Sequence, residues 1–164
     1  MKLLIASDKS GFSLKEAVKD SLIKSGHTVL DIGTQDTESP VPYYECAQRM
    51  AQKIQSGEAE RGILCCGTGM GMSIVANKYK GIYASCCESV YAAKMCRAVN
   101  DANVLCMGGW LIADWLGIRM AETFLSTEFT QDLEEWRKEW LSAAKTHVQA
   151  IEEQTFSASH NQNS

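Results

Sequence analysis

The sequence is poor in histidine and proline and has no long apolar run. Its 164 residues include three histidines and two prolines, and no segment approaches the ~18 consecutive apolar residues of a membrane helix. The apolar start, Met1 to Ala6, is too short for a signal peptide. No basic run occurs and the formal net charge is −4, which argues against nucleic acid as the main partner. We therefore expect a cytoplasmic protein with neither a membrane nor a nucleic-acid partner.

Disulfide and metal motifs are also missing. The seven cysteines are an odd number, with no C-x-x-C pair and no Cys/His cluster at zinc spacing. We expect no metal and no cofactor. Most of the cysteines are interpreted as small buried hydrophobic residues in a reducing compartment, above all Cys46, Cys86, Cys96 and Cys106. Cys65 and Cys66 are different, because they stand side by side before a glycine-rich loop.

Apolar runs alternate with helical patterns along the chain. We expect strands at 3–7, 28–32, 63–66, 82–86 and 104–107. We expect helices from 13 to the Ser25-Gly26 stop, at 42–55, up to about 77, and at 89–98, 113–125 and 131–154. The alternation predicts an α/β, three-layer Rossmann-like fold with a five-stranded parallel sheet, plus a long C-terminal helix. Residues 1–154 are predicted to form a single domain, and 155–164 a disordered polar tail.

Ligands of such folds bind at the carboxyl ends of the strands. The loop that follows the third strand there, 66–71, has three glycines in five residues. It lacks the Gly-Lys-Ser/Thr of a nucleoside-triphosphate loop, and its place in the chain is wrong for a dinucleotide fingerprint. Its glycines would let backbone amides converge on an anion, or they would serve only the geometry of a tight turn.

Cys66 ends the third strand beside these amides, which favour a thiolate that acts as nucleophile or base. A Cys–His acyl-transfer site is not favoured, because His27 lies at the wrong end of a strand and His160 in the tail. Alternation along the strand turns Cys65 to the opposite face, which argues against a redox pair. Proton abstraction next to a carbonyl fits the residues better.

That reaction requires a base, hydrogen-bond donors for an enediolate oxygen, and a group that moves a hydroxyl proton. Cys66 is the candidate base, and the amides of Gly67 to Gly71 are candidate donors. Thr68 could hydrogen-bond the substrate oxygens. Asp8 ends the first strand and either binds sugar hydroxyls or only caps the following helix.

A long stretch of the chain, GILCCGTGMGMSIVANKYKGIYA at 62–84, resembles the central signature of the ribose-5-phosphate isomerase B / galactose-6-phosphate isomerase family. The likeness extends over nearly the whole chain and includes ASDKSGFSLKEAV, VLDIGT, SGEAERGIL and NDANVLCMGG. The resemblance implies an aldose–ketose isomerase that works through a cis-enediolate without a metal. It also implies a homodimer, with a dimer of dimers left open, whose active sites are built across the subunit interface.

The resemblance assigns roles by position. It makes Cys66 the catalytic base and Thr68 the catalytic hydroxyl that handles a proton. Asp8 and Asn100 match residues that contact substrate hydroxyl groups, and the glycines match the anion hole. The implied substrate-binding set is Asp8, Lys9, Gly67, Gly69, Gly71 and Asn100.

Several family features are absent. Lys9 stands where histidine is common, Val99 replaces the histidine that opens the sugar ring, and Trp110 replaces an arginine that contacts phosphate. Pro40 replaces a loop aspartate, and the C-terminal Gly-Gly-Arg-His-x-x-Arg segment is missing. A substrate that is already open, such as a tetrose or a sugar that cyclises poorly, would not need the ring-opening histidine, and a sugar acid or an unphosphorylated sugar is equally allowed. Replacement positive charge could come from Lys9, Arg97, Arg137 and Lys138.

Three interpretations remain. The first is an isomerase of altered specificity, for a small sugar phosphate or sugar acid. The second is a true ribose-5-phosphate isomerase with a rebuilt phosphate site, and the third a silent sugar-binding homologue. Trp110 favours the first because it is too large for an open phosphate pocket, unless it and the C-terminal tryptophans, Trp136 and Trp140, are core or interface aromatics.

Overall fold

The computed structural model describes residues 1–158, whose strands form one parallel sheet in the order β2-β1-β3-β5-β4. The strands are β1 (Lys2–Ser7), β2 (Thr28–Asp31), β3 (Gly62–Cys66), β4 (Ala84–Cys86) and β5 (Val104–Gly108). The helices are α1 (Phe12–Lys24), α2 (Tyr43–Gln55), α3 (Met70–Ala76), α4 (Val90–Ala98), α5 (Asp114–Ser126) and α6 (Glu135–Ala158). The predicted α/β fold is confirmed.

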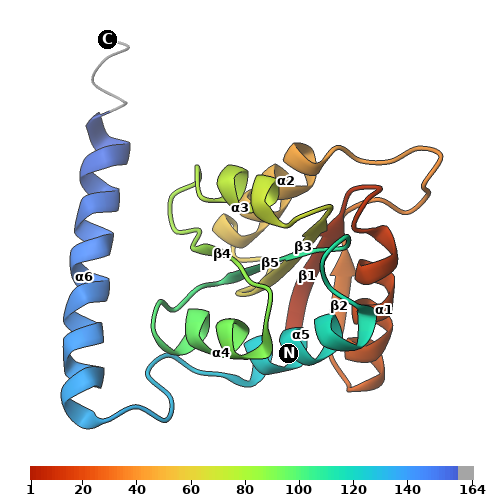
Figure 1. Ribbon diagram of the computed structural model, residues 1–164. Coiled ribbons are helices and arrows are strands. Elements are labelled where there is room, and N and C mark those ends of the chain that lie inside the picture. Colours follow the sequence, from red (N-terminus) through yellow and green to blue (C-terminus); the bar gives the residue numbers. More distant parts are fainter. Residues whose placement is uncertain (159–164) are drawn as a thin grey trace.

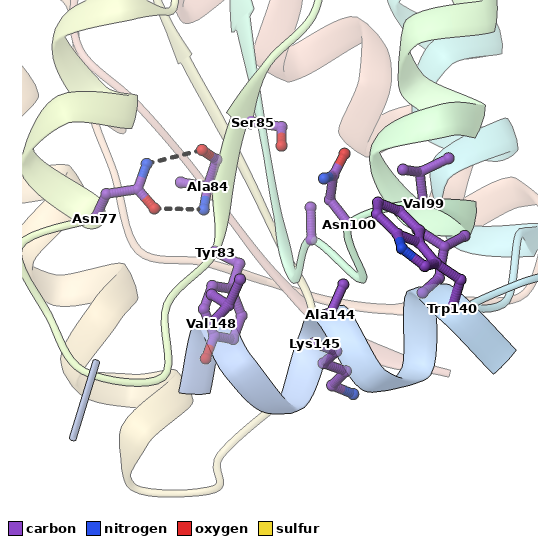
Figure 2. Close-up of a pocket in the computed structure, with 12 residues that line it drawn as sticks. Asn77, Tyr83, Ala84, Ser85, Val99, Asn100, Trp140, Ala144, Lys145 and Val148 are labelled. Atoms are coloured by element: carbon purple, nitrogen blue, oxygen red, sulfur yellow. Dashed lines mark hydrogen bonds between the residues drawn. The ribbon is translucent and has the colours of Figure 1, made fainter. Parts of the chain in front are cut away.

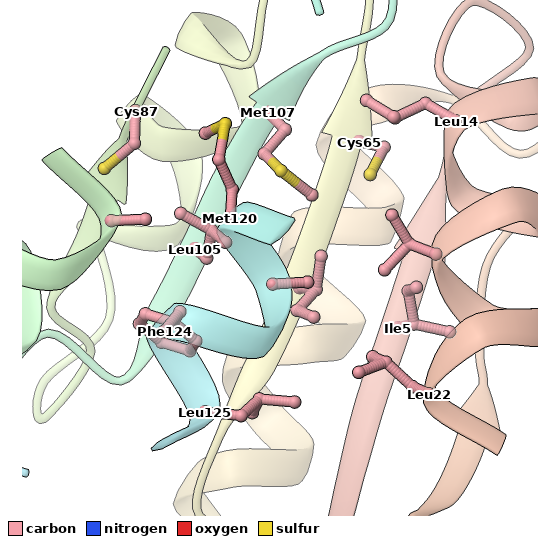
Figure 3. Packing of buried hydrophobic residues seen from close by; sticks show 14 of the residues in the cluster. Ile5, Leu14, Leu22, Cys65, Cys87, Leu105, Met107, Met120, Phe124 and Leu125 are labelled. Carbon is pink, nitrogen blue, oxygen red and sulfur yellow. The ribbon is translucent and has the colours of Figure 1, made fainter. Parts of the chain in front are cut away.

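Helices cover both faces of the sheet. Helices α2 and α3 lie on one face, and α1, α4 and α5 lie on the other (Figure 1). Successive residues of β1 and β3 point to opposite faces, so both strands are buried throughout their central parts. Figure 3 shows the packing on the second face, where Leu14 and Leu22 of α1 and Phe124 of α5 meet Ile5 and Leu105.

The strand order places a topological switch point between β1 and β3. From β1 the chain passes to β2 on one side and then to β3 on the other. Ser7 pairs with Cys65, so the residues that follow β1 and end β3 lie side by side at the carboxyl edge. On the other side of β3, Cys66 pairs with Gly108 of β5. Ligands of open α/β sheets bind at this kind of crevice.

Helix α6 differs from its predicted bounds at both ends. It begins at Glu135 rather than 131, because Thr130 and Asp132 have positive φ angles of 62° and 58°, which a right-handed helix cannot contain. It continues to Ala158, so the prediction of a disordered tail is wrong for 155–158. Glu152 and Glu153 hydrogen-bond the segment 80–83 and thereby hold the last turns of the helix. The rest of the predicted tail, 159–164, lies outside the described residues.

Helix α6 stands at the β4 edge of the sheet, apart from both helical layers (Figure 1). Between Glu135 and Ser157 only Leu141 is buried. Four large apolar side chains of the helix remain exposed, namely Trp136, Trp140, Val148 and Ile151. The alternative that placed Trp136 and Trp140 in the core is therefore wrong. Among the described residues, no helix is long and apolar enough to cross a membrane.

The prediction of buried cysteines is correct with one exception. Cys46, Cys96 and Cys106 are at most 6% exposed. Cys86 is exposed, because it ends the edge strand β4 and has no neighbouring strand on its outer side. Its thiol lies 3.5 Å from the carbonyl oxygen of Thr68, at the border of the glycine loop.

Candidate active site

The glycine loop between β3 and α3 holds the thiol of Cys66. The backbone N–H of Gly69 donates to Cys66 Sγ over 3.1 Å, and Gly69 adopts a φ of +80°, which glycine tolerates best. The turn after β5 clamps the loop from the other side, because the N–H of Gly109 donates to the carbonyl of Cys66 over 2.7 Å. A hydrogen bond from an amide to sulfur stabilises a thiolate.

Cys65 and Cys66 face opposite sides of the sheet, as predicted. Cys65 is fully buried among the residues that pack under α1 and α5, and burial raises the pKa of its thiol. Cys66 lies on the α2 and α3 face and is 5% exposed. Cys65 is therefore a core residue, and only Cys66 reaches the carboxyl edge.

Asp8 orders the turn before α1 and lies at the candidate site, whereas its binding of sugar hydroxyls stays a prediction. Its Oδ1 accepts the backbone N–H of Gly11 over 2.9 Å, which orders the turn before α1. Its side chain also lines a cavity at the carboxyl edge, next to Cys66. Burial raises the pKa of Asp8 above its usual range, although hydrogen bonds from the amides of Gly11 and Ser10 act in the opposite direction.

The cavity measures about 190 Å³ and collects most of the predicted site. Five of the eight predicted residues line it: Asp8, Cys66, Gly67, Thr68 and Gly71. Gly69 does not line the cavity, but its amide binds the thiol from within the loop. A thiol, a hydroxyl group, a carboxylate and the backbone of a glycine loop thus meet in one small space.

Three further residues complete the lining: Ser10, Tyr43 and Trp110. Trp110 was singled out in the sequence as a departure, whereas Ser10 and Tyr43 were missed. Ser10 lies in the loop after β1, and Tyr43 is the first residue of α2, directly after Pro42. Pro42 itself is the N-cap rather than the first helical residue.

Lys9 lies beside this cavity rather than in it. It lines an adjacent space of about 230 Å³ with Pro40, Val41 and Pro42, and the two spaces share Asp8 and Tyr43. The side chain of Lys9 is exposed, so it is available to an anion at the border of the two cavities.

Asn100 lies at a different place in the chain's fold. It follows α4 and precedes β5, which puts it near the amino end of β5, whereas Cys66 lies at the carboxyl edge. There, Val99 and Asn100 line a cavity of about 420 Å³ between the β4 edge and helix α6 (Figure 2). Asn77 closes another wall of this cavity with two hydrogen bonds of 2.8 Å to the backbone of Ala84 (Figure 2). Within one chain, Asn100 does not join the predicted site.

Arg97, one of the suggested replacement cations, is not available to a ligand. It is 5% exposed and its guanidinium donates to the carbonyls of Thr127 and Ala102 and to Asp101. That suggestion is therefore wrong, because the side chain is buried and its Nε and Nη1 groups already donate inside the fold. Lys138 is paired with Glu135 on the surface of α6.

No group of three or more potential ligands among residues 1–158 is arranged to hold a metal ion. The search covered histidine, cysteine, aspartate and glutamate side chains. Metal independence of the reaction stays a prediction.

The chain matches a protein-family model described as Ribose/Galactose Isomerase over residues 3–141. It is 64% identical over 156 residues to a 4-deoxy-4-sulfo-D-erythrose isomerase of Clostridium sp. (strain MSTE9), covering 95% of this chain and 98% of that protein. It is 38% identical to a D-erythrulose-4-phosphate isomerase of Pectobacterium atrosepticum, covering 79% and 85% of the two chains.

A solved structure shows the same architecture. The ribose-5-phosphate isomerase B of Clostridium thermocellum superposes with a TM-score of 0.85 at 37% sequence identity. The match covers 94% of this chain and 99% of that one. Names of the relatives thus range over four- and five-carbon sugars, all of them substrates of isomerases.

Proposed function

The chain belongs to the ribose/galactose isomerase family and is an aldose–ketose isomerase, and we propose that it acts on a four-carbon aldose with a terminal sulfonate, 4-deoxy-4-sulfo-D-erythrose. This choice of substrate is supported by the 64% identity to an isomerase of that name over nearly the full length of both chains. The product is the corresponding 2-ketose. Altered specificity, the first of the three sequence interpretations, is the one that these relatives favour.

The chemistry of this substrate agrees with Val99. A four-carbon aldose closes a five-membered ring only through an oxygen on C4, and the sulfonate replaces that oxygen. The substrate is therefore open in solution and needs no group to open a ring. Valine at the position of the family's ring-opening histidine cannot donate or accept a proton, so it suits an open substrate and is unsuited to a cyclic one.

We propose the following proton transfers. The Cys66 thiolate, held by the Gly69 amide, removes the proton from C2 and forms a cis-enediolate. Amides of the glycine loop stabilise the negative oxygen, while Thr68 Oγ1 passes the hydroxyl proton from O2 to O1. The Cys66 thiol then returns its proton to C1. One hydrogen has moved from C2 to C1 and one from O2 to O1, and nothing else is consumed.

The proposal includes a homodimer whose partner completes each site. Asn100 supports it, because this predicted substrate ligand lies away from the cavity of Cys66 in its own chain. Helix α6 supports it as well, because Trp136, Trp140, Val148 and Ile151 are each at least 50% exposed. Apolar side chains in such number on one helix are typical of an interface.

The proposal also places the enzyme in the reducing cytoplasm. All seven cysteines are free, and six of them are buried. In an oxidising compartment, the exposed thiol of Cys86 beside the glycine loop would be a liability.

Two matched cysteine variants test the base. Cys66→Ala is expected to lower kcat about 10²–10⁴-fold, the usual contribution of a positioned general base. Cys65→Ala, one residue away on the opposite face, is expected to keep kcat within a few-fold and to lose some stability. Circular dichroism checks that both variants fold. Unchanged turnover by Cys66→Ala would mean that another group is the base.

A substrate comparison tests the sulfonate. We expect the highest kcat/KM with 4-deoxy-4-sulfo-D-erythrose, a lower value with D-erythrose 4-phosphate, and the lowest with ribose 5-phosphate. NMR measures the conversion of each aldose to its ketose. In D₂O, deuterium should enter the product at C1. Preference for ribose 5-phosphate would contradict the proposed substrate, and absence of conversion with every sugar would favour the silent homologue.

A further inference from the structure

We infer that Trp110 and Tyr43 set the length of the sugar chain that this site accepts, by forming two aromatic walls against the glycine loop. The inference rests on the proposed function, since it concerns the same cavity and reaction. It names two residues that select the substrate by its chain length, through the space that their rings occupy.

Trp110 lies directly against Gly67. A Cβ atom added to Gly67 would come within 2.8 Å of two ring carbons of Trp110 and 2.9 Å of a third, so the six-membered ring covers the Gly67 Cα. The backbone N–H of Trp110 donates to the Gly67 carbonyl over 3.0 Å, which fixes the position from which the ring extends. Position 67 requires glycine, because any larger residue there would displace the ring of Trp110.

Tyr43 has the same relation to Gly71. A Cβ atom on Gly71 would lie 2.9 Å from one ring carbon of Tyr43 and 3.2 Å from the next. The ring is held in place because it packs edge-on against Tyr44, with 5.5 Å between the centroids. Its backbone starts α2, directly after the Pro42 cap. The two rings therefore contact the two ends of one catalytic loop.

The position of the base fixes where the substrate begins. C1 and C2 must lie beside Cys66 and Thr68, so the remaining carbons extend past the glycines that the rings cover. The cavity of about 190 Å³ is smaller than the ~300 Å³ at which ligand pockets usually begin. Beyond it, a fifth carbon and its anionic group would have to pass the ring of Tyr43, which borders both this cavity and the adjacent space beside Lys9.

A purely structural role of the rings is not supported by their burial. Trp110 is 72% exposed and Tyr43 is 42% exposed, so each covers the loop with one side and presents much of its surface to the cavity mouth. Removing the ring of Trp110 takes little buried apolar area from the fold. The ring lies over the catalytic loop, where it would contact a substrate, and it contributes little to the core.

The experiment compares two open-chain ketoses that differ by one carbon and carry the same phosphate, D-erythrulose 4-phosphate and D-ribulose 5-phosphate. Neither needs ring opening, so Val99 does not influence the comparison. We measure kcat/KM for both with the wild-type protein, Trp110→Ala and Tyr43→Ala. The matched controls are Trp115→Ala, a tryptophan on α5 that is 64% exposed, and Tyr91→Ala, an exposed tyrosine on α4; neither lines the cavity.

We expect the wild-type protein to prefer the four-carbon ketose at least tenfold. Trp110→Ala should lower this preference at least tenfold, and Tyr43→Ala should lower it by a smaller factor. The controls should leave it within twofold. If the preference stays within twofold of the wild type in both cavity variants while they remain folded, the inference is wrong.

Measuring the binding of inhibitors tests this inference separately from the proposed function. Three- and four-carbon aldonohydroxamate phosphates imitate the enediolates of the four- and five-carbon sugars, because their N–OH group takes the place of C1 and its oxygen. Both are titrated by calorimetry into the same proteins. A change in their relative Kd of at least tenfold in Trp110→Ala supports the inference even if the sulfonated substrate proves wrong. An unchanged ratio of Kd values overturns it whatever the natural substrate is.

Discussion

Replacement of Gly69 by alanine tests the hydrogen bond that holds the proposed base. Gly69 has a φ of +80°, and a left-handed conformation costs a residue with a Cβ about 1–2 kcal/mol. The added Cβ would also lie 2.9 Å from Cys86 Sγ and 3.0 Å from the backbone carbon of Met107. The thiol can rotate away, but the backbone of β5 cannot, so the loop must move and carry the Gly69 amide away from Cys66.

Gly57→Ala is the matched control for the backbone cost alone. Gly57 has a φ of +76° at the end of α2, and nothing lies within 4 Å of the position that its Cβ would take. It should therefore lose the same ~1–2 kcal/mol of unfolding free energy and no activity. Gly69→Ala should lose more, with an added cost of about 1–3 kcal/mol for the forced shift of the loop.

The loss of activity follows from the bond to sulfur. A hydrogen bond to a charged group is worth ~1.5–3 kcal/mol, and 1.36 kcal/mol corresponds to a tenfold change in rate. We expect Gly69→Ala to lower kcat roughly ten- to hundredfold, measured on folded protein with urea unfolding in parallel. If Gly69→Ala were destabilised as calculated but kept the kcat of Gly57→Ala, the amide would have no part in holding the base.

Three further predictions concern buried charges. Lys15 is fully buried, and its ammonium donates to Asp31 over 2.7 Å and to the Thr34 carbonyl over 2.5 Å. Lys15→Met should therefore lower the free energy of unfolding by about 3 kcal/mol, measured with urea. This is near the lower end for a broken buried pair, because Lys19 still binds Asp31. A loss below 1 kcal/mol would contradict the prediction. Burial alone would raise the pKa of Asp31, but hydrogen bonds from Lys15 and Lys19 outweigh it and hold the pKa below its usual range. The stabilisation by ionised Asp31 is then fully present above the unfolded pKa of ~3.9 and is lost as the pH falls through the lower folded value. Asp31→Asn should therefore flatten the acid end of a curve of unfolding free energy against pH. The raised pKa of Asp8 predicts that the acid limb of kcat/KM lies above pH ~3.9, and Asp8→Asn should remove that limb if the carboxylate binds substrate.

Local patterns in the sequence were sufficient for the elements and for the centre of the site. The apolar run of β3 and the glycines after it predicted a strand, a turn and a helix, because these depend on residues close in the chain. The alternation of side chains along a strand separated Cys65 from Cys66. All strands of a parallel sheet end at one edge, and the strand order, which makes β1 and β3 neighbours, placed Asp8 beside Cys66.

Errors arose where distant segments meet. The exposure of Cys86 depends on β4 being the edge strand, which no local pattern of three residues reveals. Arg97 looked available in the sequence, but the segments around 101 and 127 use its donors. The ends of α6 depend on left-handed residues before it and on contacts of its last turns with the segment 80–83.

The sequence by itself determined the fold class, the glycine loop and Cys66 as the candidate base, because these follow from the order of residue types along the chain. Only the tertiary structure decided what surrounds Cys66. It brought the rings of Trp110 and Tyr43, 67 residues apart, onto two glycines of one loop, and it kept Asn100 away from them. The physical reason is that the pairing of strands sets which loops share an edge, whereas the packing of individual side chains sets the space left between those loops.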